Sequence, residues 1–185
     1  MIKEISEKDR AYFAGLLDGE GCILINKSVS KNYIGYGFYV AFDITYKKVL
    51  LEMQGLFSGN IYEKDMEKVM SCDSSRKRLE SGCYLSNKQK QSYMYKLSGR
   101  DALYFLKVVE PFCREKKEQA LLGIKYEQGR RTNAGRYGRS DSETERCEFF
   151  YRELQRLKHE QPDETDAEID FIDDQQKLFS FEVES

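Results

Sequence analysis

The stretch AYFAGLLDGEGCILIN, residues 11–26, constrains the fold most strongly, because a helical pattern changes into a strand pattern within one turn. Asp18 and Glu20 stand in a DGEG turn directly before a β-branched, apolar segment. A helix C-terminus carries partial negative charge and repels carboxylates. Small residues lie on one side of the helical run: Ala11, Ala14 and Gly15. The chain therefore places two acids where a lone helix would not stabilise them.

Hydrophobic patterns predict the elements on either side of this stretch. Ser6 and Asp9 have the spacing of a capping box, so we expect a first helix from about residue 7 to Asp18. Strands are predicted over 22–29 and 34–46. Later patterns predict a helix over 47–57 and strands over 60–64 and 91–98. A further helix should begin after Ser98, which can cap it, and end before Pro111. The last two predicted helices cover 112–128 and 143–158.

This order of elements, α-β-β-α-β-β-α-α, predicts an α+β fold with one antiparallel β-sheet and helices on a single face. The core is αββαββα, and a C-terminal helix follows it. We expect a main domain over 1–128, a basic loop and helix over 129–160, and an acidic, poorly ordered tail over 161–185.

Charge is divided unevenly along the chain. Residues 1–158 carry 29 basic and 22 acidic side chains, for a net charge of +7, whereas residues 159–185 carry a net charge of −9. A mildly basic body permits a polyanionic partner without requiring one.

Composition argues against several kinds of chemistry and location. The single histidine, His159, disfavours a histidine metal cluster or a Ser-His-Asp triad. The five cysteines include no CxxC pair, which favours reduced thiols over disulfides or a zinc site. No apolar run approaches the ~18 residues that cross a membrane, and the charged start is unlike a signal peptide. We therefore expect no membrane partner and an intracellular protein, in the cytoplasm, the nucleoid or an organelle matrix.

The outward positions of the predicted sheet mix hydrogen-bonding and basic groups. Two-stranded ribbons with such side chains fit the DNA major groove, where they contact base edges and phosphates. An ordinary solvated sheet face is the alternative. The candidate DNA-binding residues are Asn26, Ser28, Tyr39, Asp43, Thr45, Tyr62, Lys64, Lys88, Lys90, Ser92 and Lys96.

Two segments resemble one known family. FAGLLDGEG, residues 13–21, resembles the LAGLIDADG motif of homing endonucleases from Ala14 through Gly21, with Phe13 in place of the leading leucine. Residues 95–127 resemble the second half of that family's domain, including its Pro-aromatic-x-x-x-Lys-Lys-x-Gln pattern at Pro111–Gln119. The similarity spans about residues 7–128 and implies that the antiparallel sheet is saddle-like.

The resemblance implies a homodimer of the single-motif type with a metal site. Ala14, Gly15 and Asp18 would form the motif contact, because small residues let two helices approach closely. A single visible motif means that the second helix comes from an identical chain. Glu20 would then lie beside its partner's copy, which requires protonation or bound cations. Glu20 and Gly19 are the implied metal residues, and the cofactor is Mg²⁺ or another divalent cation such as Mn²⁺.

Lys116 is the second candidate catalytic residue beside Glu20. It shares a helical stripe with Ala120 and Ile124, so we expect it to point inward, and it aligns with the family's active-site lysine. Lys117 is the rival, and a lysine that merely snorkels to solvent is the alternative.

Some positions depart from the family pattern. Many members have a different polar residue at the end of the second strand, near the water of the active site, and Tyr46 or Lys47 stands there in this chain. Glu118 replaces a position that is often basic.

These features predict a site-specific, intron-encoded, double-strand DNA endonuclease that hydrolyses phosphodiesters with a divalent metal. It would act as a homodimer on a long, near-palindromic site. The alternative is a non-cleaving nucleic-acid-binding protein of the same fold, either an intron RNA-splicing maturase or a DNA-binding regulator. The expected partners are double-stranded DNA, a second copy of the chain and possible intron RNA.

Overall fold

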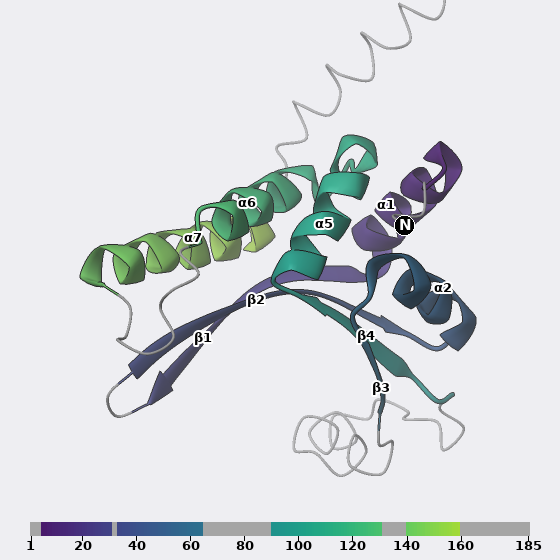
Figure 1. Ribbon diagram of the computed structural model, residues 1–185, viewed down its shortest axis with the longest axis horizontal. Helices are drawn as coiled ribbons and strands as arrows, with labels where there is room; N and C mark the ends of the chain where they lie inside the picture. The colour runs from purple at the N-terminus through teal and green to yellow at the C-terminus, as the bar shows by residue number, and fades with distance from the viewer. Residues whose placement is uncertain (1–4, 31–32, 65–89, 131–139, 160–185) are drawn as a thin grey trace, which may run out of the picture.

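The computed structural model describes residues 5–30, 33–64, 90–130 and 140–159. Its elements follow one another in the order seen in Figure 1: α1 (Glu7–Glu20), β1 (Gly21–Ser30), β2 (Tyr33–Ile44), α2 (Lys47–Phe57), β3 (Asn60–Glu63), β4 (Tyr93–Ser98), α5 (Arg100–Val109), the 3₁₀ helix η1 (Glu110–Phe112), α6 (Lys117–Gln128) and α7 (Asp141–His159). None of the helices in these ranges is long and apolar enough to cross a membrane.

The four strands form one antiparallel sheet in the order β1-β2-β4-β3. The helices lie above one face of this curved sheet, and no described helix covers the opposite face (Figure 1). The expected α+β class, with helices on a single face, is confirmed. The sequence fits the arrangement because β2 alternates buried residues under the helices with polar or small residues on the uncovered face.

The core lies between the sheet and the helices. Phe38, Val40 and Phe42 of β2 are buried there with Leu97 of β4. Gly123 lets α6 approach the sheet, because an added Cβ would lie 2.9 Å from the Phe38 ring. The burial of Phe38, Val40 and Phe42 agrees with the expected outward placement of Tyr39 and Asp43.

Helix α1 begins at the expected cap. The Asp9 backbone N–H donates to Ser6 Oγ at 3.2 Å, and the Ser6 hydroxyl donates to Asp9 Oδ2 at 2.7 Å. The helix runs to Glu20, two residues beyond the expected end, because Gly21 supplies the C-cap. Both acids of the DGEG turn therefore lie within the last helical turn.

Two predicted helix boundaries in the second half are wrong. The helix expected over 112–128 begins at Lys117, since η1 and an extended Cys113 precede it. The backbone N–H groups of Arg114 and Lys116 donate to Asp18, so this segment is held as a loop. Helix α5 is preceded by Gly99 at φ +53° with no side-chain cap, so Ser98 does not cap it.

Helix α7 is the predicted C-terminal helix, extended at its start to Asp141. Cys147 and Leu154 are buried against the core. Positions 131–139 and 160 of the expected loop and helix segment, and the whole expected tail over 161–185, lie outside the described residues.

Candidate active site

The candidate site lies where α1 passes directly into β1. Gly21 makes this junction possible, because an added Cβ would lie 2.6 Å from Leu17 Cδ1 and 2.9 Å from the Leu17 Cα and carbonyl oxygen. Its own N–H donates to the Leu16 and Leu17 carbonyls. The chain can therefore leave the helix without a linker, and Glu20 is exposed at the junction.

Asp18 fastens a distant segment to this helix end. Its two carboxylate oxygens accept the backbone N–H of Arg114 at 2.9 Å and of Lys116 at 3.0 Å. A hydrogen bond to a charged group contributes about 1.5–3 kcal/mol. Asp18 thus holds the loop before α6 against the end of α1.

The same loop places the ammonium of Lys116 at the C-terminus of α1. Lys116 Nζ donates to the Leu17 carbonyl at 3.0 Å and also to the Asp18 carbonyl. Helix α1 has no basic residue in its own last turn. Lys116 therefore supplies the positive charge that the helix dipole favours there, an interaction typically worth about 0.3–1 kcal/mol.

Burial isolates the thiol beside this loop. The pKa of Cys113 is raised to about 12, mainly by burial and secondly by the charge of Asp18. Cys113 is therefore a neutral, packed side chain rather than a nucleophile.

Glu20 differs from Asp18 in having no partner among the described residues. No hydrogen bond or ion pair joins its carboxylate to any of them, and its side chain is exposed. The described residues contain no group of three acids, cysteines or histidines that could hold a metal. The exposed Glu20 carboxylate fits Mg²⁺, which takes one or two carboxylates and fills its remaining positions with water or phosphate oxygens.

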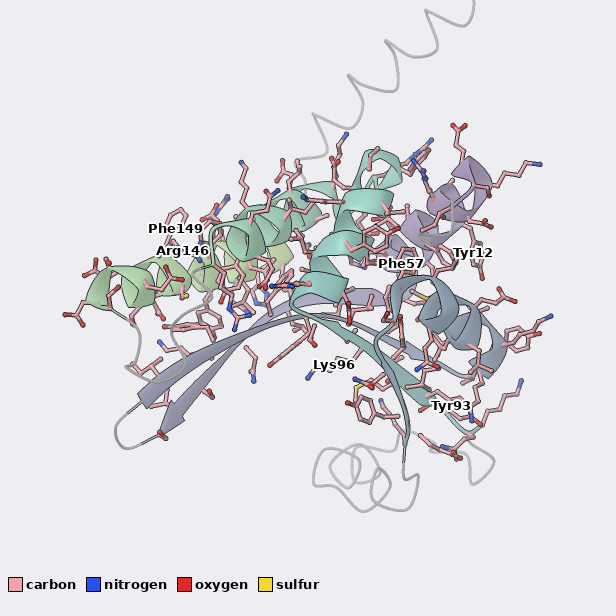
Figure 2. The ribbon with its side chains drawn as sticks, in the orientation of Figure 1. Tyr12, Phe57, Tyr93, Lys96, Arg146 and Phe149 are labelled. Atoms are coloured by element: carbon pink, nitrogen blue, oxygen red, sulfur yellow. The ribbon has the colours of Figure 1, made fainter. Side chains whose placement is uncertain are left out.

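The uncovered face of the sheet begins next to this junction. Strand alternation and register place these side chains on it: Asn26 and Ser28 of β1, Tyr39 and Asp43 of β2, Tyr62 of β3 and Lys96 of β4. Figure 2 shows Lys96 on the side away from the helices. Its ammonium lies 3.7 Å from the centroid of the Tyr39 ring, a cation–π contact that orients the lysine.

Solved structures with the same arrangement identify the fold. The chain matches a homing endonuclease I-CvuI in complex with its target in the presence of 2 mM Ca, with a TM-score of 0.60, 14% identity, and coverage of 84% of this chain and 85% of that one. This chain has the LAGLIDADG homing-endonuclease fold. An archaeal intron-encoded homing endonuclease, I-Vdi141I, complexed with DNA matches at a TM-score of 0.59 and 16% identity, covering 91% of this chain and 96% of that one.

Further matches agree on the fold. The homing endonuclease I-TnaI has a TM-score of 0.53 and 13% identity, and the match covers 80% of this chain and 92% of that one. A second I-CvuI complex, in the presence of 2 mM Mg with DNA not cleaved, matches at a TM-score of 0.59. No family model matches the sequence, and the search of curated proteins finds no match. The resemblance drawn from the LAGLIDADG-like motif is confirmed by the shared fold.

The LAGLIDADG-like helix has two different faces. Ala14 is fully buried in the chain's own core, together with Phe13 and Leu17. Gly15 and Gly19 are exposed, and a Cβ added to either would have no neighbour within 4 Å. Of the three residues expected at a dimer contact, Gly15 is therefore open to a second helix. Ala14 and Asp18 are engaged within this chain.

The remaining predicted DNA-binding positions that the structure describes lie at the borders of the sheet. Thr45 is in a bend after β2, while Lys90 and Ser92 precede β4. Lys64, after β3, pairs with Asp43 on the uncovered face. Lys88 lies outside the described residues.

Tyr46 and Lys47, the two candidates for one position that departs from the LAGLIDADG pattern, stand at the start of α2, and Glu118 stands in the first turn of α6. Tyr46 is the N-cap of α2 and is 61% exposed, whereas Lys47 Nζ lies 4.8 Å from the centroid of the Tyr93 ring.

Sequence reasoning missed the backbone partners of the site. Lys116 is not on a helical stripe with Ala120, since α6 begins one residue later. It is nonetheless directed inward, because its ammonium binds the carbonyls of Leu17 and Asp18. Local periodicity carries no signal for a contact across 99 residues. The pairing of Asp18 with the loop was equally invisible, although an acid in a helix C-terminal turn already required a compensating partner.

Proposed function

We propose that this protein is a metal-dependent, site-specific double-strand DNA endonuclease that acts as a homodimer on a long, near-palindromic site. One observation carries the proposal: Asp18 holds the loop of Lys116 so that this ammonium and the exposed carboxylate of Glu20 share one helix end. A cation and a free acid at one point suit phosphodiester hydrolysis, in which negative charge develops on phosphate oxygens.

The neighbouring sheet face supports DNA as the substrate. Asn26 and Ser28 present hydrogen-bonding side chains on this face of β1, the strand that leaves the site, and Lys96 of β4 adds a basic one. Side chains of this kind contact base edges in the major groove. Solved structures of the same fold, I-CvuI and I-Vdi141I, are complexes with DNA.

The open face of α1 supports the homodimer. Gly15 and Gly19 leave room for a second backbone, as small residues do at close helix contacts. An isologous contact there would bring two Glu20 side chains together near a twofold axis. Each chain would then supply one acid and one Lys116 to the paired site.

Glu20, with Gly19 beside it, would hold Mg²⁺ or Mn²⁺. When bound, such a cation neutralises the adjoining carboxylates and polarises phosphate oxygens. Lys116 stabilises the negative charge that grows on the phosphate, and the last carbonyls of α1 hold its ammonium in place. Asp18 is a positioning residue, because it acts through the loop that carries Lys116.

The decisive test starts from a DNA duplex selected by binding from a random-sequence library. Wild-type protein with Mg²⁺ should cut both strands of this duplex, and Glu20→Gln should bind it with similar affinity but cut at least about 100-fold more slowly. Glu52→Gln, at an exposed position on α2, is the matched control and should cut normally.

Other outcomes would decide against parts of the proposal. Normal cutting by Glu20→Gln would exclude Glu20 as the metal-binding acid. Wild-type binding without cutting in either Mg²⁺ or Mn²⁺ would favour a non-cleaving DNA-binding protein of the same fold.

A further inference from the structure

The end of α7 reaches the strand that leaves the candidate active site. Lys158, in the last turn of α7, lies with its Nζ 3.6 Å from Cys22 Sγ. Cys22 is the second residue of β1 and follows Glu20 by two positions. Gln119 of α6 donates to the Leu157 carbonyl at 3.5 Å and ties this last turn to its neighbour helix. The last turn of α7 is thus tied to its neighbour helix, and the Lys158 ammonium lies against Cys22 of β1.

Lys158 also reaches the side of the sheet opposite its own helix. Gly21, Ile23 and Ile25 of β1 are buried under the helices, so alternation places Cys22 on the uncovered face. Strand β1 is an edge of the sheet that the described residues form. A lysine from α7 can therefore pass around this edge and present its charge to the uncovered face.

The charge of Lys158 has no acidic partner in the described part of the chain. Its ammonium lies instead against the Cys22 sulfur, a weak acceptor for such a group. By contrast, Lys27 on the same strand is paired with Glu148 at 2.7 Å. A lysine that no described acid pairs, at the sheet edge beside Cys22, is suited to an anionic ligand that approaches from the uncovered face.

We propose that Lys158 binds a non-bridging oxygen of a DNA backbone phosphate next to the cleaved bond. This role rests on the proposed function and extends it to α7, which the LAGLIDADG-like motif does not include. Lys116 is occupied by the α1 carbonyls beneath the junction, whereas Lys158 approaches from the β1 edge. The two lysines therefore act on different phosphates, and Lys158 contributes to DNA position and affinity rather than to base selection.

Salt dependence of DNA binding measures this interaction directly. For B-DNA, each phosphate that a lysine neutralises adds about 0.9 to the steepness of log K plotted against log salt. With a random-sequence 24-base-pair duplex as the probe, Lys158→Gln should make the slope shallower by about 1.8 per dimer. Lys158→Arg should retain the wild-type slope, because the guanidinium keeps the charge.

Lys107→Gln is the matched control, because Lys107 is exposed on α5 in the helical layer. It should leave the slope unchanged. Thermal unfolding of each variant, followed by circular dichroism, checks that the fold persists. A Lys158→Gln protein that is folded and has the wild-type slope overturns the inference while the endonuclease proposal stands. A wild-type protein without salt-dependent DNA binding overturns both.

The position of the bound phosphate is tested on the duplex selected by the wild-type protein. A neutral methylphosphonate is placed at one backbone position at a time around the cleaved bond. Wild-type affinity should fall at one adjacent phosphate, about tenfold, while Lys158→Gln should be insensitive at that phosphate. Equal sensitivity of both proteins at every adjacent phosphate would contradict the assignment.

Discussion

The glycines of the LAGLIDADG-like segment differ in what surrounds them. Gly21 is buried, and an added methyl group would collide with the backbone of Leu17. Gly15 and Gly19 are exposed, and nothing in the described chain fills the space beside them. Gly21 is required by the protomer itself, whereas the space beside Gly15 and Gly19 would be filled in the proposed dimer. The requirement for folding and the proposed requirement for assembly can therefore be separated by experiment.

Gly21→Ala should have the largest effect on the fold. The methyl group meets backbone atoms that cannot rotate away, so we expect the free energy of unfolding to fall by about 3 kcal/mol. For a chain of this size the melting temperature should fall by roughly 6–12 °C. Gly19→Ala, with open space at the same helix end, should change the free energy of unfolding by less than about 1 kcal/mol. Equal destabilisation of both variants would refute the distinction.

Asp18→Ala should have the second largest effect, and it should affect activity more than stability. The backbone N–H groups of Arg114 and Lys116 lose their acceptor, which should lower the free energy of unfolding by about 2 kcal/mol. Cutting should fall because the loop no longer holds Lys116. In a double-mutant cycle, Asp18→Ala should add little to the decrease in cutting caused by Lys116→Met. Fully additive decreases would show that Asp18 acts independently of Lys116.

Gly15→Leu should have the smallest effect on the protomer. Leucine is a better helix former than glycine, so the free energy of unfolding of the protomer should rise by about 0.5–1 kcal/mol. The proposed dimer should nevertheless dissociate, and sedimentation velocity measures that change. Gly55→Leu, at another exposed helical glycine with open space around it, should give the same gain without dissociation. A dimer that tolerates Gly15→Leu would place the interface elsewhere.

Local chemistry explains why much of the fold could be predicted. The cap at Ser6, the alternation of β2 and the order of elements depend on neighbours in the sequence, and the structure confirms all three. The expected start of the helix at residue 112 was wrong because Cys113 is extended and the N–H groups of Arg114 and Lys116 bind the distant Asp18, which local periodicity does not reveal.

The candidate site was less predictable because its parts meet only in three dimensions. Glu20 and Lys116 were expected from the motif and the resemblance. Their relation through Asp18 and the α1 carbonyls depends on contacts across 96 to 99 residues. The approach of Lys158 to Cys22 spans 136 residues, and no local pattern marks it. Ala14 was expected on the outer face of α1 because size alone does not distinguish an open helix face from a tightly packed one.

The long sequence separation between Asp18 and the loop before α6 also sets the order in which parts of the protein fold. Contacts between residues far apart in sequence form only after the intervening chain has closed into a loop. Helix α1 and the β1–β2 hairpin can form while the chain is still being synthesised, but the cation at the end of α1 arrives only after residue 116 has emerged and docked. A nascent or truncated chain that lacks this residue can carry the whole acidic motif and still lack the ammonium of the proposed site.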